Sequence, residues 1–191
     1  MSKKTKYKMT GVLFAGGKSS RMGKNKAFLE KEGVSLAERS LAVLDSVFEE
    51  VLVSSNSPEL FERFGVPVIE DIFPDKGPMG GLYSVLKLAK YDYVFIMACD
   101  MPNVSSEGIQ FLIDKIGNED IVVPSVLGRL HPLHAFYHKR ITEEVENRLM
   151  KERLKIAELI ENCNAKIVQG MSNEILVNAN TPEEWAMIIH P

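Results

Sequence analysis

The chain has 191 residues, of which 45% are hydrophobic and 26% charged, and its formal net charge is −3 at pH 7. This length suits one domain with a sizeable core, and the negative net charge argues against binding to nucleic acid or to a membrane surface through bulk charge. The two cysteines, Cys99 and Cys163, are too few for a disulfide framework or a cysteine-based metal site, and they favour a reducing, cytoplasmic location.

The N-terminal stretch MSKKTKYKMT is basic and lacks the apolar core of a signal peptide. We therefore expect residues 1–8 to form a flexible basic tail. No apolar run approaches the roughly 20 residues that a membrane-spanning helix needs. Because there are no repeats, low-complexity stretches or linkers, residues 1–191 are expected to form a single domain.

Stretches with strand-like and helix-like patterns alternate along the chain. Short apolar runs followed by turn residues indicate strands, and apolar residues three and four positions apart indicate helices. In chain order, the strands are expected at residues 9–15, 49–56, 66–71, 91–100, 120–126, 133–138, 165–169 and 174–178. The helices are expected at residues 35–48, 58–65, 80–90, 105–117, 139–152, 155–162 and 181–189. This alternation predicts a single-domain, Rossmann-like, three-layer α/β/α fold with a mostly parallel sheet.

Polar or small residues follow the first four expected strands. In sheets of this kind, ligands bind beyond the carboxyl ends of the strands, at the point where the strand order reverses. These side chains are therefore expected to converge on one cleft. The four segments are Ala15-Gly16-Gly17, Ser54-Ser55-Asn56, Glu70-Asp71 and Cys99-Asp100.

The segment LFAGGKSSRMGKNKAFLE places a glycine pair and several basic residues after the first strand. Gly16 and Gly17 allow a sharp turn and a close approach to a ligand, and free backbone N–H groups there could hold phosphate, with charge added by Arg21 and Lys26. It is not a Walker A loop, because Val12 stands where that loop needs glycine, and the GxGxxG pattern is absent. The segment thus predicts a phosphate loop of another kind or a plain turn with solvated lysines.

Two aspartates stand at strand ends. Asp100 closes an otherwise apolar strand, where a carboxylate suits Mg²⁺ and substrate phosphates; the alternative is a cap for the next turn. Asp71 lies in VIEDIFPDKGPMGG, between a strand and a helix, and could bind a ribose hydroxyl, a base edge or a metal, or belong to a plain loop.

The stretch GRLHPLHAFYH holds three histidines, His131, His134 and His138, at mixed spacings of three and four. A zinc site would need four ligands at a defined spacing, so this pattern argues against one. Arg129 and His131 are expected in a loop, as contacts to an anionic substrate or as plain surface residues.

Taken in order, several motifs resemble the molybdenum cofactor guanylyltransferases, a family of α/β nucleotidyltransferases with the sheet of the nucleotide-diphospho-sugar transferases. The motifs are FAGGKSSRMGKNK, VIED with GPMGG, ACDMP, HPLHAFYH and VNANTPEEW. The resemblance implies that GMP is transferred from GTP to molybdenum-molybdopterin with Mg²⁺, with release of pyrophosphate and formation of molybdopterin guanine dinucleotide. It also implies transient contacts with other proteins of molybdenum cofactor biosynthesis and with acceptor molybdoenzymes.

The family's residue roles transfer to matching positions of this chain. The resemblance implies that the backbone of Phe14, Ala15, Gly16 and Gly17 holds guanine and phosphate. It further implies that Lys26 and Arg21 stabilise charge on the triphosphate, that Asp71 lies in the nucleotide pocket and that Asp100 is the Mg²⁺ ligand. The residues expected near the metal or the pterin are Asn178 and Asn180, with Arg129 and His131 as candidates for the pterin side.

Two positions depart from the family pattern. Ser54 stands where the family has Asn, with Asn56 two residues further on, and this puts the contact from Ser54 to the nucleotide in doubt. Phe14 stands where the family usually has Leu.

Three other functions stay open. A CTP-dependent molybdopterin cytidylyltransferase would usually read Ala-Ala-Gly in the first loop, whereas Gly16 here leaves more room for a purine. A sugar-phosphate nucleotidyltransferase would more often carry extra domains. A non-catalytic nucleotide-binding adaptor is less favoured because Lys26 and Asp100 are present.

Overall fold

The computed structural model describes residues 5–16 and 26–176. Eight strands form the main sheet of this part of the chain, in the order β10-β7-β9-β6-β1-β4-β5, and β8 pairs with β7. A small hairpin joins β2 to β3. The strands are β1 (Tyr7–Phe14), β2 (Glu30–Lys31), β3 (Val34–Ser35), β4 (Phe48–Ser54), β5 (Val68–Ile69), β6 (Tyr93–Ala98), β7 (Ile121–Val126), β8 (Arg129–Leu130), β9 (His134–His138) and β10 (Ala165–Val168).

Most neighbouring strands of the sheet run parallel. β1 is parallel to β4 and β6, β4 to β5, and β10 to β7. β9 lies antiparallel between β6 and β7, and β8 is antiparallel to β7. The predicted mostly parallel α/β sheet is therefore confirmed, and within this main sheet the described antiparallel pairs all involve β8 or β9.

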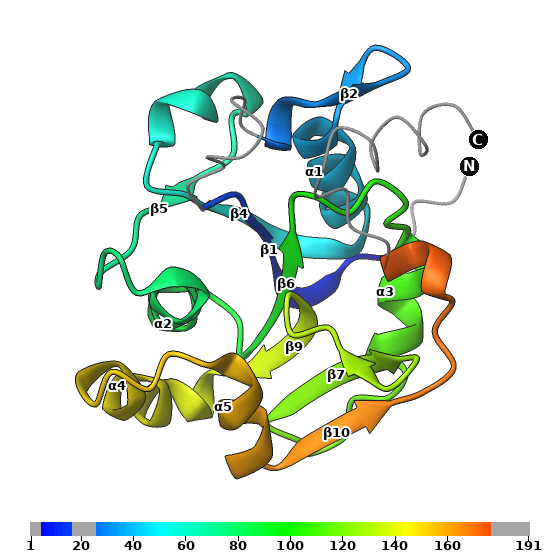
Figure 1. The fold of residues 1–191 in the computed structure, drawn as a ribbon. Coiled ribbons are helices and arrows are strands. Elements are labelled where there is room, and N and C mark those ends of the chain that lie inside the picture. Colours follow the sequence, from blue (N-terminus) through cyan, green and yellow to red (C-terminus); the bar gives the residue numbers. More distant parts are fainter. Residues whose placement is uncertain (1–4, 17–25, 177–191) are drawn as a thin grey trace.

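Helices cover both faces of the sheet (Figure 1). α1 and α3 pack on one face, whose buried cluster includes Leu44 and Leu112, and α2, α4 and α5 pack on the other, whose cluster includes Leu82. Side chains of successive residues in a strand point to opposite faces of the sheet. In β1, Leu13 accordingly packs in the first cluster and Val12 in the second. The helices are α1 (Leu36–Val47), α2 (Gly77–Leu88), α3 (Ser106–Ile113), α4 (Thr142–Met150) and α5 (Ile156–Asn162).

Serine side chains start α1 and α3. The Ser35 hydroxyl accepts from the backbone N–H of Glu38, and the Ser105 hydroxyl accepts from that of Gly108. Such caps satisfy N–H groups that a helix start leaves without intrahelical partners. None of the described helices is long and apolar enough to cross a membrane.

Several expected boundaries were wrong. The flexible tail was expected to include residues 7 and 8, but β1 begins at Tyr7, whose hydroxyl donates to Gln110 of α3 at 2.7 Å. The helix expected at 58–65 is two 3₁₀ turns, Pro58–Leu60 and Glu62–Phe64. α2 starts at Gly77, three residues before its expected start at residue 80.

The strand expected at 174–178 was also wrong in its described part. Residues Asn173–Leu176 form a 3₁₀ turn. Its apolar side chains are buried by packing against helices and not within a sheet. Leu176 is buried in the α1 and α3 layer, and Ile175 packs against that layer at Gly108 of α3. The expected helix at 181–189 lies outside the described residues.

Gly11, at the centre of β1, leaves room for an aromatic ring. A Cβ atom at this position would overlap with Cδ2 of Phe48, a fully buried ring that stacks on Phe95. We expect Gly11→Ala to lower the free energy of unfolding by about 2 kcal/mol, because the buried ring cannot move aside without disturbing the core. Urea denaturation would measure this.

Gly16→Ala is the matched control, because no described atom lies within 4 Å of a Cβ at Gly16. Equal stabilities of the two variants would contradict the tight packing inferred around Gly11.

Candidate active site

The carboxyl ends of β1, β4, β5 and β6 meet at one edge of the sheet. Phe14 is in register with Ser54 on β4 and with Ala98 on β6, and Ser54 is in register with Ile69 on β5. The backbone pairing extends one step past the strands, since Ala15 N–H donates to the Ser54 carbonyl and Cys99 N–H donates to the Phe14 carbonyl, both at 3.0 Å. The described parts of the four segments therefore meet at one edge of the sheet, as expected, and a shared cleft there stays a prediction.

The loop after β1 begins in an open position. Phe14 and Ala15 are buried, whereas Gly16 is exposed. An added Cβ at Gly16 would meet no described atom within 4 Å, so this backbone can be approached closely from outside. The other predicted residues of the loop, Gly17 and Arg21, lie outside the described residues.

Lys26 and Asp100 face each other across this edge. Lys26 Nζ lies 3.5 Å from Asp100 Oδ2, and the two side chains are 19% and 17% exposed. The 3₁₀ turn that carries Lys26 (Lys26–Phe28) is anchored at its other end, because the Phe28 ring packs against Phe61 and Phe64. The structure thus brings together Lys26, which was expected to stabilise charge on the triphosphate, and Asp100, which was expected to bind Mg²⁺.

The second oxygen of Asp100 is a candidate metal ligand. Oδ1 is buried and has no hydrogen-bond partner within the described residues, which is costly for a carboxylate unless something binds there. No group of three or more His, Cys, Asp or Glu side chains placed to hold a metal occurs in the same residues. Mg²⁺ often takes only one or two protein carboxylates and completes its shell with substrate phosphates and water, so Asp100 fits that ion.

Cys99, beside Asp100, does not suit nucleophilic chemistry. Burial, with a further contribution from the Asp100 charge, raises the pKa of its thiol to about 12. The thiol therefore stays protonated at neutral pH.

Asp71 is held by a residue whose contact sequence reasoning missed. Asn56 Nδ2 donates to Asp71 Oδ2 at 2.9 Å, and Asp71 N–H donates to Asn56 Oδ1 at 2.8 Å. Burial raises the pKa of the half-buried Asp71 carboxyl, and the hydrogen bond from Asn56 opposes that rise. Ser54 and Ile69 are in register on β4 and β5, and Asn56 and Asp71 each follow two positions later. Knowledge of this strand register would have predicted the contact between Asn56 and Asp71.

Ser54 is buried against α2. A Cβ at Gly81 of α2 would lie 3.1 Å from Ser54 Oγ and 3.2 Å from Cε2 of Phe14. The two positions that depart from the family pattern are therefore neighbours, and both touch the same point of the α2 backbone. A contact from Ser54 to a nucleotide stays a prediction.

The segment with Arg129 and His131 runs beside the end of β6. The backbone N–H of Ala98 donates to the Leu133 carbonyl at 2.9 Å, two residues before Asp100. Arg129 was expected in a loop but lies in β8, the second arm of a hairpin with β7. Burial, and then the Arg129 charge, lower the pKa of His131, so its imidazole is neutral at pH 7.

The neighbouring His134 has no access to a ligand. It is fully buried, its ring centroid lies 5.0 Å from that of Phe95, and burial lowers its pKa to about 3.

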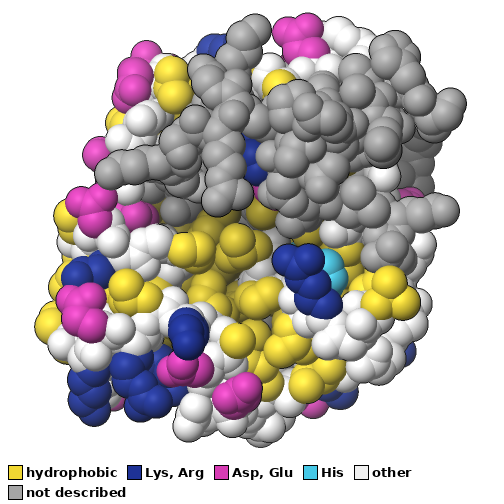
Figure 2. Space-filling view, in the orientation of Figure 1, with side chains coloured by type: hydrophobic (Ala, Val, Ile, Leu, Met, Phe, Trp, Pro, Cys, Tyr) yellow, Lys and Arg dark blue, Asp and Glu magenta, His cyan; other side chains and the backbone are white. Residues whose placement is uncertain are grey.

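Near the centre of Figure 2, hydrophobic side chains gather in a hollow, with a basic side chain and a histidine at its rim. Such a surface suits a ligand with a flat organic part and an anionic group. Asn178 and Asn180 lie outside the described residues.

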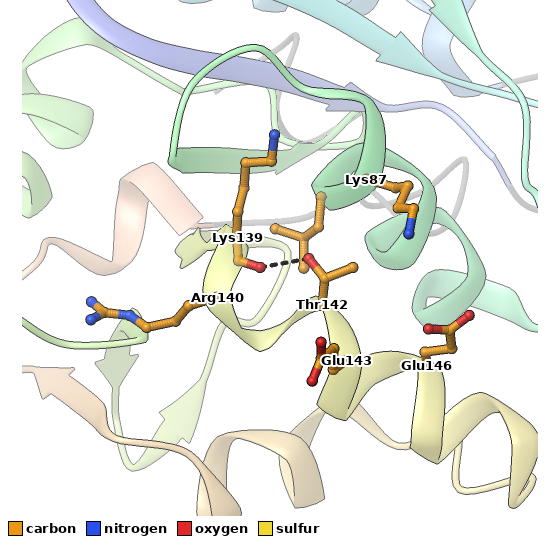
Figure 3. A pocket seen from close by; sticks show the side chains of 7 residues that line it. Lys87, Lys139, Arg140, Thr142, Glu143 and Glu146 are labelled. Carbon is orange, nitrogen blue, oxygen red and sulfur yellow. Dashed lines mark hydrogen bonds between the residues drawn. The ribbon is translucent and has the colours of Figure 1, made fainter.

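A second depression lies between α2 and α4, remote from the carboxyl edge (Figure 3). Its charges are mixed, since Lys87 and Lys139 line it together with Glu143 and Glu146. Lys139 Nζ already donates to the Ala89 carbonyl at 2.6 Å. The residues that line this depression therefore offer no counterpart to the group at the sheet edge, which combines a glycine, a lysine and two aspartates.

Comparisons with known proteins agree with this geometry. Residues 11–167 match the family model described as MobA-like NTP transferase domain. A protein of Bacillus cereus (strain AH187) named probable molybdenum cofactor guanylyltransferase is 38% identical over 188 residues, which cover 93% of this chain and 94% of that protein. A crystal structure of an Aquifex aeolicus VF5 protein matches with a TM-score of 0.79 and 30% identity over 90% of this chain and 93% of that one.

The fold is also that of a molybdopterin-guanine dinucleotide biosynthesis protein A from Archaeoglobus fulgidus. Its crystal structure matches with a TM-score of 0.81 and 20% identity over 93% of this chain and 95% of that one. At this identity the likeness concerns the fold, and it agrees with the three-layer architecture expected from the sequence.

Proposed function

The chain belongs to the MobA-like NTP transferase family, and from this premise we propose that it transfers GMP from GTP to molybdenum-molybdopterin, with release of pyrophosphate. The family and the reaction class, nucleotidyl transfer, are those that the sequence resemblance predicted. The observation that carries the proposal is the pairing of Lys26 with Asp100, whose second oxygen is buried without a partner in the described residues, at the strand edge next to Gly16.

The proposed chemistry needs no side-chain nucleophile. A terminal phosphate oxygen of molybdopterin attacks the α-phosphorus of GTP in line, a new P–O bond forms, and the bond from the α-phosphorus to the bridging oxygen breaks, so that pyrophosphate leaves. Lys26 would place its positive charge on the triphosphate, with Arg21 assisting. Asp100 would hold Mg²⁺, which when bound supplies further neutralisation of phosphate charge.

Other groups of the edge would bind and orient the two substrates. The backbone of Phe14, Ala15, Gly16 and Gly17 is proposed to hold guanine and phosphate. Asp71 would contact the same nucleotide, and Ser54 is proposed to make a further contact to it. On the pterin side we propose Arg129, His131, Asn178 and Asn180. The proposal includes Mg²⁺ dependence, a cytoplasmic location and transient contacts with other cofactor-biosynthesis proteins and acceptor molybdoenzymes.

Pyrophosphate release by the purified protein tests the proposal. Release is expected when GTP, Mg²⁺ and molybdopterin are all present. Release with CTP in place of GTP would point to the cytidylyltransferase alternative. Activity with a sugar phosphate in place of molybdopterin would point to the sugar-phosphate enzymes, and nucleotide binding without release in any combination would point to the adaptor.

Gly16→Ala tests the choice of purine. The added methyl group enters the open space beside the loop, where we propose that guanine lies, so the affinity for GTP is expected to fall roughly tenfold. The affinity for the smaller CTP is expected to change much less. Calorimetric titration of both nucleotides with Mg²⁺ measures this, and an equal loss for both would contradict the role given to Gly16. Unchanged thermal stability is the control.

A further inference from the structure

Asn56 and Asp71 form a two-point pair at the edge of the sheet. One amide group accepts from the Asp71 backbone N–H at 2.8 Å and donates to the Asp71 carboxylate at 2.9 Å. Because the two contacts need the oxygen on one side and the nitrogen on the other, they fix the orientation of the amide. They also fix the Asp71 carboxylate relative to its own backbone.

The pair stands where the sheet gives Asp71 no further support. β5 is two residues long, and its pairing with β4 ends with the hydrogen bond from Ser55 N–H to the Ile69 carbonyl at 3.0 Å. Asn56 and Asp71 are the next residues along these two segments whose groups can meet. Beyond the last backbone hydrogen bond between β4 and β5, the Asn56 side chain therefore connects the two segments.

The neighbouring backbone is held independently of Asn56. Ser55 Oγ accepts from Ser57 N–H at 3.2 Å, and the Ser84 hydroxyl of α2 accepts from Ile72 N–H at 2.9 Å while donating to the Gly80 carbonyl. Removal of the Asn56 side chain therefore leaves the turns on both sides in place. The orientation of the Asp71 carboxylate is the feature that depends on it.

The electrostatics of Asp71 point the same way. Its pKa is raised by burial, and the contribution that lowers it comes from Asn56. Of the charged groups on the same loop, Glu70 and Asp75 are acidic, and Lys76 has its ammonium 2.6 Å from Glu152. Loss of the Asn56 amide would therefore raise the pKa of Asp71 further, and the carboxylate would take up a proton at a higher pH than in the native protein.

We propose that Asn56 is a positioning residue for nucleotide binding, which holds the Asp71 carboxylate in one orientation as a hydrogen-bond acceptor for the nucleotide. This inference rests on the proposed function, in which Asp71 contacts GTP. The role differs from the one that the sequence resemblance implied for position 54, which was a direct contact to the nucleotide; this chain has a buried serine there.

The test compares Asn56→Ala with Asp71→Ala and with the control Asn147→Ala, an exposed asparagine on α4. GTP binding is measured by calorimetry with Mg²⁺ across a range of pH, and kcat and KM by pyrophosphate release. Asn56→Ala is expected to weaken GTP binding roughly tenfold at pH 8, and the pH below which binding falls off should be higher than in the native protein. KM for GTP should rise while kcat stays within about twofold, because binding is lost equally in the ground and transition states.

Asn56→Asp gives a second variant of the same shape. It keeps the acceptor for Asp71 N–H but replaces the donor with a second carboxylate, so its loss of affinity is expected to exceed that of Asn56→Ala. Circular dichroism and thermal melting establish that each variant is folded.

Two results would overturn the inference alone. One is native GTP binding by Asn56→Ala when Asp71→Ala binds weakly. The other is a pH dependence of GTP binding that is the same in Asn56→Ala and in the native protein, which would mark a structural role only. In both cases the nucleotide contact of Asp71 would stand. Native GTP binding by Asp71→Ala would instead remove that contact from the proposed function, and the inference with it.

Discussion

Asp100→Ala is expected to reduce pyrophosphate release at least about 1,000-fold while the protein stays folded. The carboxylate lies at the mouth of β6, and one of its oxygens is buried without a hydrogen-bond partner in the described residues. A group in that state contributes little to stability, because its desolvation is not compensated within the described fold. Its removal therefore acts on the reaction, through loss of the proposed Mg²⁺ ligand.

The experiment on Asp100 needs a neutral variant of the same shape and a surface control. Asp100→Asn keeps the volume and removes the charge, and it should lose nearly as much activity as Asp100→Ala. Asp45→Ala removes a carboxylate that is 72% exposed on α1 and should leave turnover unchanged. Native turnover by a folded Asp100→Ala protein would refute the assignment of the metal ligand.

Lys26→Ala is expected to lower kcat by about 100- to 1,000-fold, with a smaller effect on KM for GTP. Its ammonium lies 3.5 Å from Asp100 Oδ2 and its side chain is 19% exposed, so the charge acts where water screens it poorly. Charge on the leaving pyrophosphate grows as the P–O bond breaks, and a cation placed there stabilises the transition state more than bound GTP. Steady-state kinetics with varied GTP would separate the two parameters.

Lys26→Arg sharpens this prediction. Arginine keeps the charge but not the compact shape of an ammonium group, so partial recovery is expected. Lys87→Ala, at the depression between α2 and α4, is the control and should behave like the native protein. A Lys26→Ala variant that changes only KM would show that the residue binds GTP without favouring the transition state. The effects of Lys26→Ala and Asp100→Ala should not add, because the two groups are in direct contact.

The sequence allowed the layers and the site edge to be predicted where apolar runs are long and end abruptly. β1 and β6 are such runs, so the positions of Gly16 and Asp100 could be predicted from local pattern alone. The pair formed by Asn56 and Asp71 could not, because it depends on the register between β4 and β5, which is set by packing over the whole sheet.

The wrong strand prediction at residues 174–178 has a cause in tertiary packing. Ile175 and Leu176 have the apolar character of a strand, but they bury that surface on the α1 and α3 layer. Among the histidines, His134 and His131 differ by three residues, yet one is sealed against Phe95 and the other is partly exposed. Periodicity indicates which residues are apolar, whereas the partner that covers them is decided by tertiary packing.

The contact of Gly81 with Phe14 and Ser54 limits the paths by which this binding edge can be altered. An added atom at Gly81 would have to fit 3.1 Å from the serine oxygen and 3.2 Å from the phenylalanine ring, so the three positions share one fixed volume. Asparagine at position 54 would need space that the larger ring at position 14 now fills. The order of substitutions therefore matters: the aromatic residue has to shrink before the serine can grow, and a library that varies position 54 alone will sample mostly overpacked proteins.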